Sequence, residues 1–193
     1  MTSLELLQQI FPVLRGAVPV VLLTVLIAAA IYDVRYRRIP NWVTAGGVLL
    51  GIAINTLIGE TGGRGLLFSL AGFGVAFGIY MVLYVLRAMG AGDVKLMAAV
   101  GALVGWKAWF GVFFVTAIVG GIMALLLVLV RGRLKHTLWN VGFIVSEMGH
   151  GRPAYVGKEE LDVRSPKAVG LPHGAVIAIS TFFFLAICLR LPR

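Results

Sequence analysis

The chain has 193 residues, of which 60% are hydrophobic and only 13% charged, and its mean hydropathy is +0.97. This composition excludes an ordinary water-soluble domain and indicates an integral membrane protein. A spanning helix needs about 20 mostly apolar residues, so six spans would occupy roughly 120 positions and leave only short loops. We therefore predict one membrane-embedded, all-α domain over residues 1–193. The net charge of +9 indicates loops anchored at anionic lipid headgroups, not a nucleic-acid surface.

The start of the chain and its single cysteine exclude several further classes. Residues 1–15 carry Glu5, Gln8 and Gln9 and lack a basic start, so we expect no cleaved signal peptide. Cys188 is the only cysteine, which rules out an internal disulfide and a multi-cysteine zinc site. His136, His150 and His173 are too scattered along the chain to indicate a metal site. We expect neither a metal nor a cofactor.

Six apolar runs follow one another along the chain. They are Ala17–Tyr32, Trp42–Ile58, Leu66–Leu86, Val94–Val104, Trp109–Val130 and Leu171–Leu189. The fourth run is short enough to be a re-entrant or merely buried segment. Together with the fifth it makes 37 residues, Val94–Val130, whose only charges are Lys95 and Lys107. That length is sufficient for two brief helices joined at Gly105-Trp106-Lys107.

The basic residues favour six complete spans. Lys and Arg in short loops mark the cytoplasmic side of a membrane protein. With six spans, twelve basic residues fall on one side and five on the other, whereas a fourth segment that failed to cross would leave eight against nine. We therefore predict a six-span polytopic helical bundle with both termini outside.

The longest predicted loop, residues 131–170, contains a stripe of apolar side chains at helical spacing. Its members are Leu134, Leu138, Val141, Val145 and Met148. The stripe predicts a cytoplasmic amphipathic helix that lies on the membrane, ended by Gly149, Gly151 and Pro153. We expect this helix to serve as an anchor, with a role in handling the substrate as the alternative.

Two aspartates, Asp33 and Asp93, lie against the ends of long apolar runs, where an ionised carboxylate is costly and functional by default. The six-span topology places both on the cytoplasmic face. Two neighbouring carboxyl groups cannot both ionise cheaply, so one keeps a proton while the other stays charged. Such a pair can activate a water molecule against a peptide carbonyl without a metal. Taken singly, Asp33 could instead pair with Arg37, and Asp93 could be the N-cap of the fourth helix.

Three segments resemble the signature segments of the prepilin peptidases, the GxGD class of membrane aspartyl proteases. They are residues 32–42 (YDVRYRRIPNW), 90–97 (GAGDVKLM) and 170–176 (GLPHGAV). Asp33 and Asp93 match the catalytic pair of that family. We assign Gly90, Gly92 and Lys95 to the support of the catalytic loop, with Lys95 as a headgroup and topology anchor and not a catalyst. Residues 39–41 are most similar to the tight-adherence or Flp pilus subgroup.

The resemblance implies an aspartic-type endopeptidase of the bacterial inner membrane that cleaves the short basic leader of type IV prepilin-like precursors at the cytoplasmic membrane face. Its partners would be such precursors, each a leader followed by a hydrophobic helix, and membrane lipid. Larger members of the family carry a CxxC-containing insertion associated with methylation, and we predict no separate methyltransferase domain here. Two other classes stay open. One is a small proton-coupled transporter, and the other is a non-catalytic assembly subunit of a pilus or secretion machine.

Overall fold

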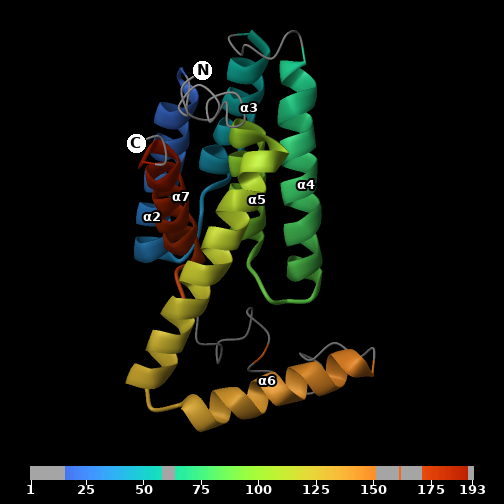
Figure 1. The fold of residues 1–193 in the computed structure, drawn as a ribbon, viewed down its shortest axis with the longest axis vertical. Coiled ribbons are helices and arrows are strands. Elements are labelled where there is room, and N and C mark those ends of the chain that lie inside the picture. Colours follow the sequence, from blue (N-terminus) through green and yellow to red (C-terminus); the bar gives the residue numbers. More distant parts are fainter. Residues whose placement is uncertain (1–15, 58–63, 151–160, 162–170, 191–193) are drawn as a thin grey trace.

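The computed structural model describes residues 16–57, 64–150, 161 and 171–190. The segment on which we based the expectation of no signal peptide, residues 1–15, lies outside them, as do Gly151 and Pro153. Within the described ranges the secondary structure is helical apart from short turns (Figure 1). The helices are α2 Val18–Tyr36, α3 Asn41–Leu57, α4 Gly65–Val85, α5 Ala91–Val130, α6 Leu134–Gly149 and α7 His173–Arg190.

Helices α2, α4 and α5 are long and apolar enough to cross a membrane, and α3 and α7 are shorter apolar helices. Large apolar side chains cover the outside of the bundle, among them Val20, Ile27, Leu49, Leu67 and Phe114, each more than half exposed. An outer surface of this kind fits a lipid solvent and not water. The prediction of an all-helical membrane protein is therefore confirmed at this level.

Helix α5 contains a break that reverses the chain. Gly105 has φ 73° and ψ 163°, a conformation open to glycine and unfavourable for other residues. Before the break, Gly101 packs against Gly72 of α4; after it, Gly111 and Gly120 pack against Phe184 and Val176 of α7. The first half of α5 thus runs away from the α4–α5 turn and the second half returns (Figure 1). The predicted junction of two helices at Gly105 is confirmed.

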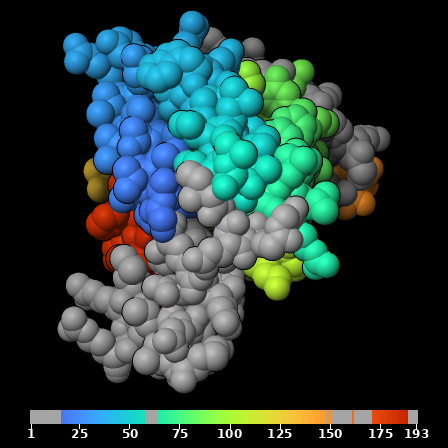
Figure 2. Space-filling view, turned by 90° about the horizontal axis from the view of Figure 1, so that it is seen from above, coloured from blue at the N-terminus to red at the C-terminus, as the bar shows by residue number. Residues whose placement is uncertain are grey.

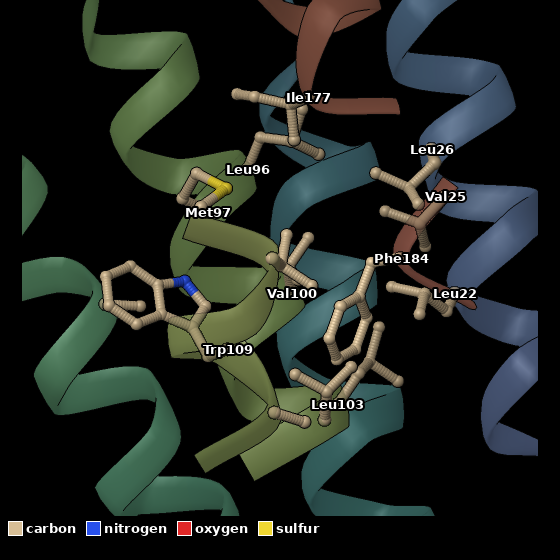
Figure 3. Close-up of a cluster of buried hydrophobic side chains, with 14 of the residues drawn as sticks. Leu22, Val25, Leu26, Leu96, Met97, Val100, Leu103, Trp109, Ile177 and Phe184 are labelled. Carbon is tan, nitrogen blue, oxygen red and sulfur yellow. The ribbon is translucent and has the colours of Figure 1, made fainter. Parts of the chain in front are cut away.

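The core forms where α2, α5 and α7 meet. Leu22, Val25 and Leu26 of α2 point toward Val100 and Leu103 of α5, with Phe184 and Ile177 of α7 beside them (Figure 3). These side chains are almost completely buried. Helix α3 lies beside α2, and α4 lies on the other side of α3, as the view from above shows (Figure 2). Their contacts with α5 hold its first half inside the bundle.

Glycines allow α4 and α3 to approach α5 closely. The Gly72 and Gly101 backbones touch, so a methyl group added to either would overlap the carbonyl oxygen of the other. On α3, a Cβ atom at Gly51 would lie 3.0 Å from the backbone of Ala102 and Leu103. Close backbone approach at small residues is the usual means of helix association in membranes.

A buried polar side chain also joins these three helices. The Asn55 amide of α3 donates to the Ser69 hydroxyl oxygen (2.9 Å) and to the carbonyl oxygens of Ala102 (3.1 Å) and Leu103 (3.2 Å). The Ser69 hydroxyl donates in turn to the Gly51 carbonyl (3.2 Å). Both carbonyls that Asn55 reaches on α5 lie just before the Gly105 break, where the helix ends and leaves them available.

Replacement of Gly72 by alanine tests the close contact of α4 with α5. The added methyl group would force the two backbones apart, and overpacking of this kind costs about 1–3 kcal/mol. We expect Gly72→Ala to lower the thermal unfolding temperature of the detergent-solubilised protein. Gly74→Ala on the same helix is the matched control, because its Cβ would meet nothing within 4 Å. Equal unfolding temperatures for the two variants would contradict the packing described here.

Candidate active site at the ends of α2, α5 and α7

Asp33 lies in the last turn of α2, and its side chain is 8% exposed. The helix continues past it to Tyr36 and ends at Arg37, which adopts the left-handed conformation (φ 54°) and donates its N–H to the Asp33 carbonyl oxygen. The Asp33 carboxylate points elsewhere: its Oδ2 accepts a hydrogen bond of 2.7 Å from the backbone N–H of Gly174. Arg37 thus caps α2 through its backbone, while the Asp33 carboxylate bonds to α7.

The hydrogen bond from the Gly174 N–H to Asp33 caps the start of α7. The first N–H groups of a helix lack partners within it, and a side-chain oxygen usually accepts one of them. Pro172 precedes α7 and has no side-chain acceptor, so the Asp33 carboxylate performs this role from another helix. Space is tight, because a Cβ atom at Gly174 would lie 3.0 Å from both Asp33 Oδ2 and Ile39 Cδ1. Glycine at position 174 therefore lets α7 meet the carboxylate.

Asp93 occupies the first turn of α5. The N-cap of this helix is Gly90, which is extended (φ −79°, ψ 153°), and Asp93 is the third helical residue. Its Oδ2 accepts a hydrogen bond of 3.3 Å from the Gly90 N–H, the reciprocal half of a capping box. The alternative reading of Asp93 as the N-cap itself was wrong by three positions, because glycine in an extended conformation takes that place.

The two carboxyl groups come together at one end of the bundle. Asp93 lies within electrostatic range of Asp33 and of His173, the first residue of α7. Tyr80 of α4, almost completely buried, lies within range of Asp93 as well. The fold thus brings together two acids that are distant in the sequence, beside a histidine and a tyrosine.

Ile39, in the short turn between α2 and α3, forms a wall of this site. A Cβ atom at Gly92 would lie 3.3 Å from the Ile39 Cβ, and one at Gly174 would lie 3.0 Å from its Cδ1. The side chain therefore contacts both helix starts that frame the acids. Gly92 permits the close approach of the α2–α3 turn to α5.

Lys95 lies away from the acids. Residues two apart on a helix point about 200° apart around its axis, and Lys95 extends toward α3, where its Nζ donates to Asn41 Oδ1 at 2.9 Å. There it lines a mostly apolar pocket of about 390 Å³ with residues of α3, α4 and α5, among them Thr44, Val48 and Phe73. Gly90, by contrast, contacts the Asp93 carboxylate, and Gly92 packs against Ile39.

Sequence reasoning named both acids but not their neighbours Gly174, His173 and Tyr80 as site residues. A helix that begins after Pro172 without a capping side chain was the available signal for Gly174, because its N–H must find an acceptor elsewhere. Tyr80 lies within an apolar helix and gives no such signal. Among the described residues, no cluster of three or more His, Cys, Asp or Glu side chains could hold a metal ion.

The two acids, one buried and one partly buried, lie at the ends of apolar helices of membrane-spanning length. Residues 20–125 match the model of the type IV leader peptidase family. The chain belongs to this family. The match includes both acids, and Gly174 and His173 lie beyond it.

Curated prepilin leader peptidases are also similar in sequence to this chain. The prepilin leader peptidase/N-methyltransferase of Aeromonas hydrophila is 33% identical over 121 residues, which are 60% of this chain and 42% of the relative. The protein of that name from Myxococcus xanthus (strain DK1622) is 32% identical over 120 residues, 58% of this chain and 35% of the relative. The similarity therefore spans less than half the length of these relatives. No solved structure matches the chain.

A designed disulfide tests the position of the α2–α3 turn against α5. The Cβ separation of 3.3 Å between Ile39 and position 92 is close to the roughly 3.5–4.5 Å of disulfides. We expect an Ile39→Cys/Gly92→Cys variant, built with Cys188→Ser, to form an internal disulfide that mass spectrometry of a proteolytic digest detects. Ile39→Cys/Gly121→Cys is the control, since no atom lies near a Cβ at Gly121. Similar cross-linking of both pairs would refute the placement of Ile39.

Proposed function

We propose that this protein is a membrane aspartic endopeptidase that removes the short basic leader of type IV prepilin-like precursors at the cytoplasmic membrane face. The observation that carries the proposal is the convergence of Asp33 and Asp93, from helices distant in the sequence, in a chain of the type IV leader peptidase family. The curated relatives named above are prepilin leader peptidases, which supports this substrate class.

The proposed topology has six crossings, formed by α2, α3, α4, the two halves of α5, and α7. The reversal of the chain at Gly105 supports this topology. The start of α2 and the end of α7 also lie on the same side of the bundle, as an even number of crossings requires (Figure 1). The acids lie at the opposite end, beside Arg35, Arg37 and Arg38. The excess of basic residues on this side favours the cytoplasm.

Aromatic side chains support an interface at the level of the acids. Tyr32 contacts Trp42 at 6.0 Å and Tyr36 at 5.6 Å between ring centroids. Trp42 and Tyr36 are each more than half exposed. Trp and Tyr gather where membrane meets water, because one part of each ring system is apolar and another polar. A peptide bond just outside a membrane helix would be at this depth.

The proposed chemistry uses the two acids and one water molecule. The pair shares a single proton, because two neighbouring carboxylates cannot both ionise cheaply. The ionised member removes a proton from water as it attacks the scissile carbonyl, and the protonated member donates to the carbonyl oxygen. Gly90 and Gly92 support the turn that carries Asp93. Lys95 anchors this end of the bundle at lipid headgroups through its position beside Asn41.

Helix α6 is proposed to lie on the cytoplasmic membrane surface. It runs across the end of the bundle that carries the acids (Figure 1). Leu138, Val141 and Val145 recur along one side of it and are each more than half exposed, as is Trp139. Exposed apolar residues at helical spacing, with an aromatic beside them, are typical of a helix that rests at the interface.

Coexpression with a prepilin-like precursor tests the function. We expect the parent to shorten the precursor, and Asp33→Asn or Asp93→Asn to abolish processing, because asparagine keeps the shape and removes the ionisable group. Glu147→Gln on α6 is the matched control and should process normally. The readout is precursor size by gel and mass spectrometry, with membrane insertion checked for each variant.

Processing by either Asp variant at the parental rate would refute the two-acid mechanism. Loss of processing with normal insertion would exclude a non-catalytic assembly subunit. A transporter would require proton-linked uptake by purified protein in vesicles. That class would also place its carboxylates near the middle of the bilayer, whereas Asp33 and Asp93 lie in the last and first turns of their helices.

A further inference from the structure

The two acids of the site have unequal hydrogen-bond partners. Asp33 Oδ2 accepts a buried bond of 2.7 Å from the Gly174 N–H, whereas Asp93 Oδ2 accepts a bond of 3.3 Å from the Gly90 N–H. Charge-assisted bonds from N–H to carboxylate are about 2.7–2.9 Å long, shorter than the usual neutral bond. The longer bond of 3.3 Å to Asp93 does not require a charged acceptor, because the carbonyl oxygen of a protonated acid accepts such a bond as well as a carboxylate does. The shorter bond to Asp33 therefore favours Asp33 as the member of the pair that carries the negative charge.

The helix ends around Asp33 also matter. Asp33 lies at the carboxyl end of α2, where the partial negative charge of the helix opposes a carboxylate. The amino end of α7 meets the carboxylate directly, and its partial positive charge and unpaired N–H groups compensate. Without α7, Asp33 would be a buried carboxylate at the wrong end of a helix. Its ionised form therefore depends on Gly174.

We propose that the amino end of α7, through the Gly174 N–H, holds Asp33 as the ionised base of the pair, so that Asp93 carries the shared proton. This inference rests on the proposed function and divides the roles within it. Gly174 is then a positioning residue, because it acts on the substrate only through Asp33. The assignment gives the third signature segment, residues 170–176, a function in the reaction.

The proton movements of the reaction balance with these roles. Asp33 takes a proton from the attacking water as the new C–O bond forms, and Asp93 gives its proton to the carbonyl oxygen. In the second step Asp33 gives the acquired proton to the leaving nitrogen as the C–N bond breaks. Asp93 recovers a proton from one hydroxyl of the tetrahedral intermediate. Both acids return to their starting states, and one water has been consumed.

The other ionisable groups near Asp33 come from each element that packs around it. Asp93 faces it from α5, while His173 of α7 and Tyr80 of α4 lie within electrostatic range of Asp93. On α2 itself, Arg37 is one turn away, and α3 carries no ionisable side chain. Gly174→Ala leaves all of these groups in place. A changed pH profile in that variant therefore reports on the bond to Asp33.

The test compares Gly174→Ala with Gly120→Ala. A methyl group at position 174 would lie 3.0 Å from Asp33 Oδ2 and 3.1 Å from its Cβ, so the carboxylate must move. At position 120 of α5 the methyl group would make an ordinary contact of 3.6 Å with Val176 of α7, the helix that also carries Gly174. We expect Gly174→Ala, whose methyl group requires a shift of a few tenths of an ångström, to lower kcat by up to about 10-fold with little change in KM, since a misplacement of about 1 Å can cost roughly 100-fold.

The pH profile separates a positioning role from a purely structural one. A base that loses its donor ionises only at higher pH, so the acidic limb of kcat/KM should move to higher pH in Gly174→Ala and stay in place in Gly120→Ala. An unmoved limb in a folded Gly174→Ala protein would overturn the proposal, even if kcat fell. Cleavage by the parent, with loss in Asp33→Asn and Asp93→Asn, would leave the proposed function intact in that case.

Chemical labelling of the parent gives an answer that does not depend on the folding of a variant. Epoxides esterify ionised carboxylates, so an active-site-directed epoxide peptide should label residue 33, as identified by mass spectrometry of the digest. A label on residue 93, or no label on residue 33 in protein that cleaves precursor, would overturn the assignment.

Discussion

The contact between the Asp33 carboxylate and the amino end of α7 links the fold of this protein to its candidate chemistry. It closes the bundle between its first and last described helices, and it caps a helix whose own sequence supplies no cap after Pro172. Under the roles proposed above, the same bond also stabilises the charge of Asp33, which would otherwise be unfavourable at the carboxyl end of α2. Loss of this bond would then free the start of α7 and remove the stabilisation of that charge. A structural cap and a catalytic base are thus compatible roles for one side chain.

The position of Asp93 depends on a different constraint, the burial of the first half of α5. Gly72, Gly101 and Gly51 allow α4 and α3 to pack directly on its backbone, and Asn55 binds carbonyls next to its end at Gly105. This half of the helix is therefore fixed on several sides, although it is short. Because Asp93 lies in its first turn, the packing of α5 sets where the second carboxyl group faces. The start of α7 then places His173 and Gly174 beside the two acids.

The sequence predicted much of this from patterns that depend on local chemistry. Apolar runs located the helices to within a few residues, and glycine followed by Trp106 and Lys107 marked the break in α5. The cost of a carboxylate beside apolar segments identified Asp33 and Asp93. What could not be predicted were the contacts made between helices. Nothing in residues 170–176 indicates which carboxylate caps α7, and nothing around Tyr80 indicates that it faces Asp93. The alternative of Asp93 as an N-cap missed the true cap, Gly90, because glycine is a weaker cap signal than aspartate.

The most direct measurement of the central contact is the backbone amide resonance of Gly174 in protein reconstituted in lipid nanodiscs. Its assignment follows from ¹⁵N-glycine labelling and from the signal that disappears in Gly174→Ala. A short bond to a carboxylate predicts a strongly downfield amide proton that moves upfield when Asp33 is replaced by asparagine and changes far less in Asp93→Asn. A Gly174 amide with an ordinary shift that ignores the Asp33 substitution would contradict the account, because α7 would then not be held by that carboxylate.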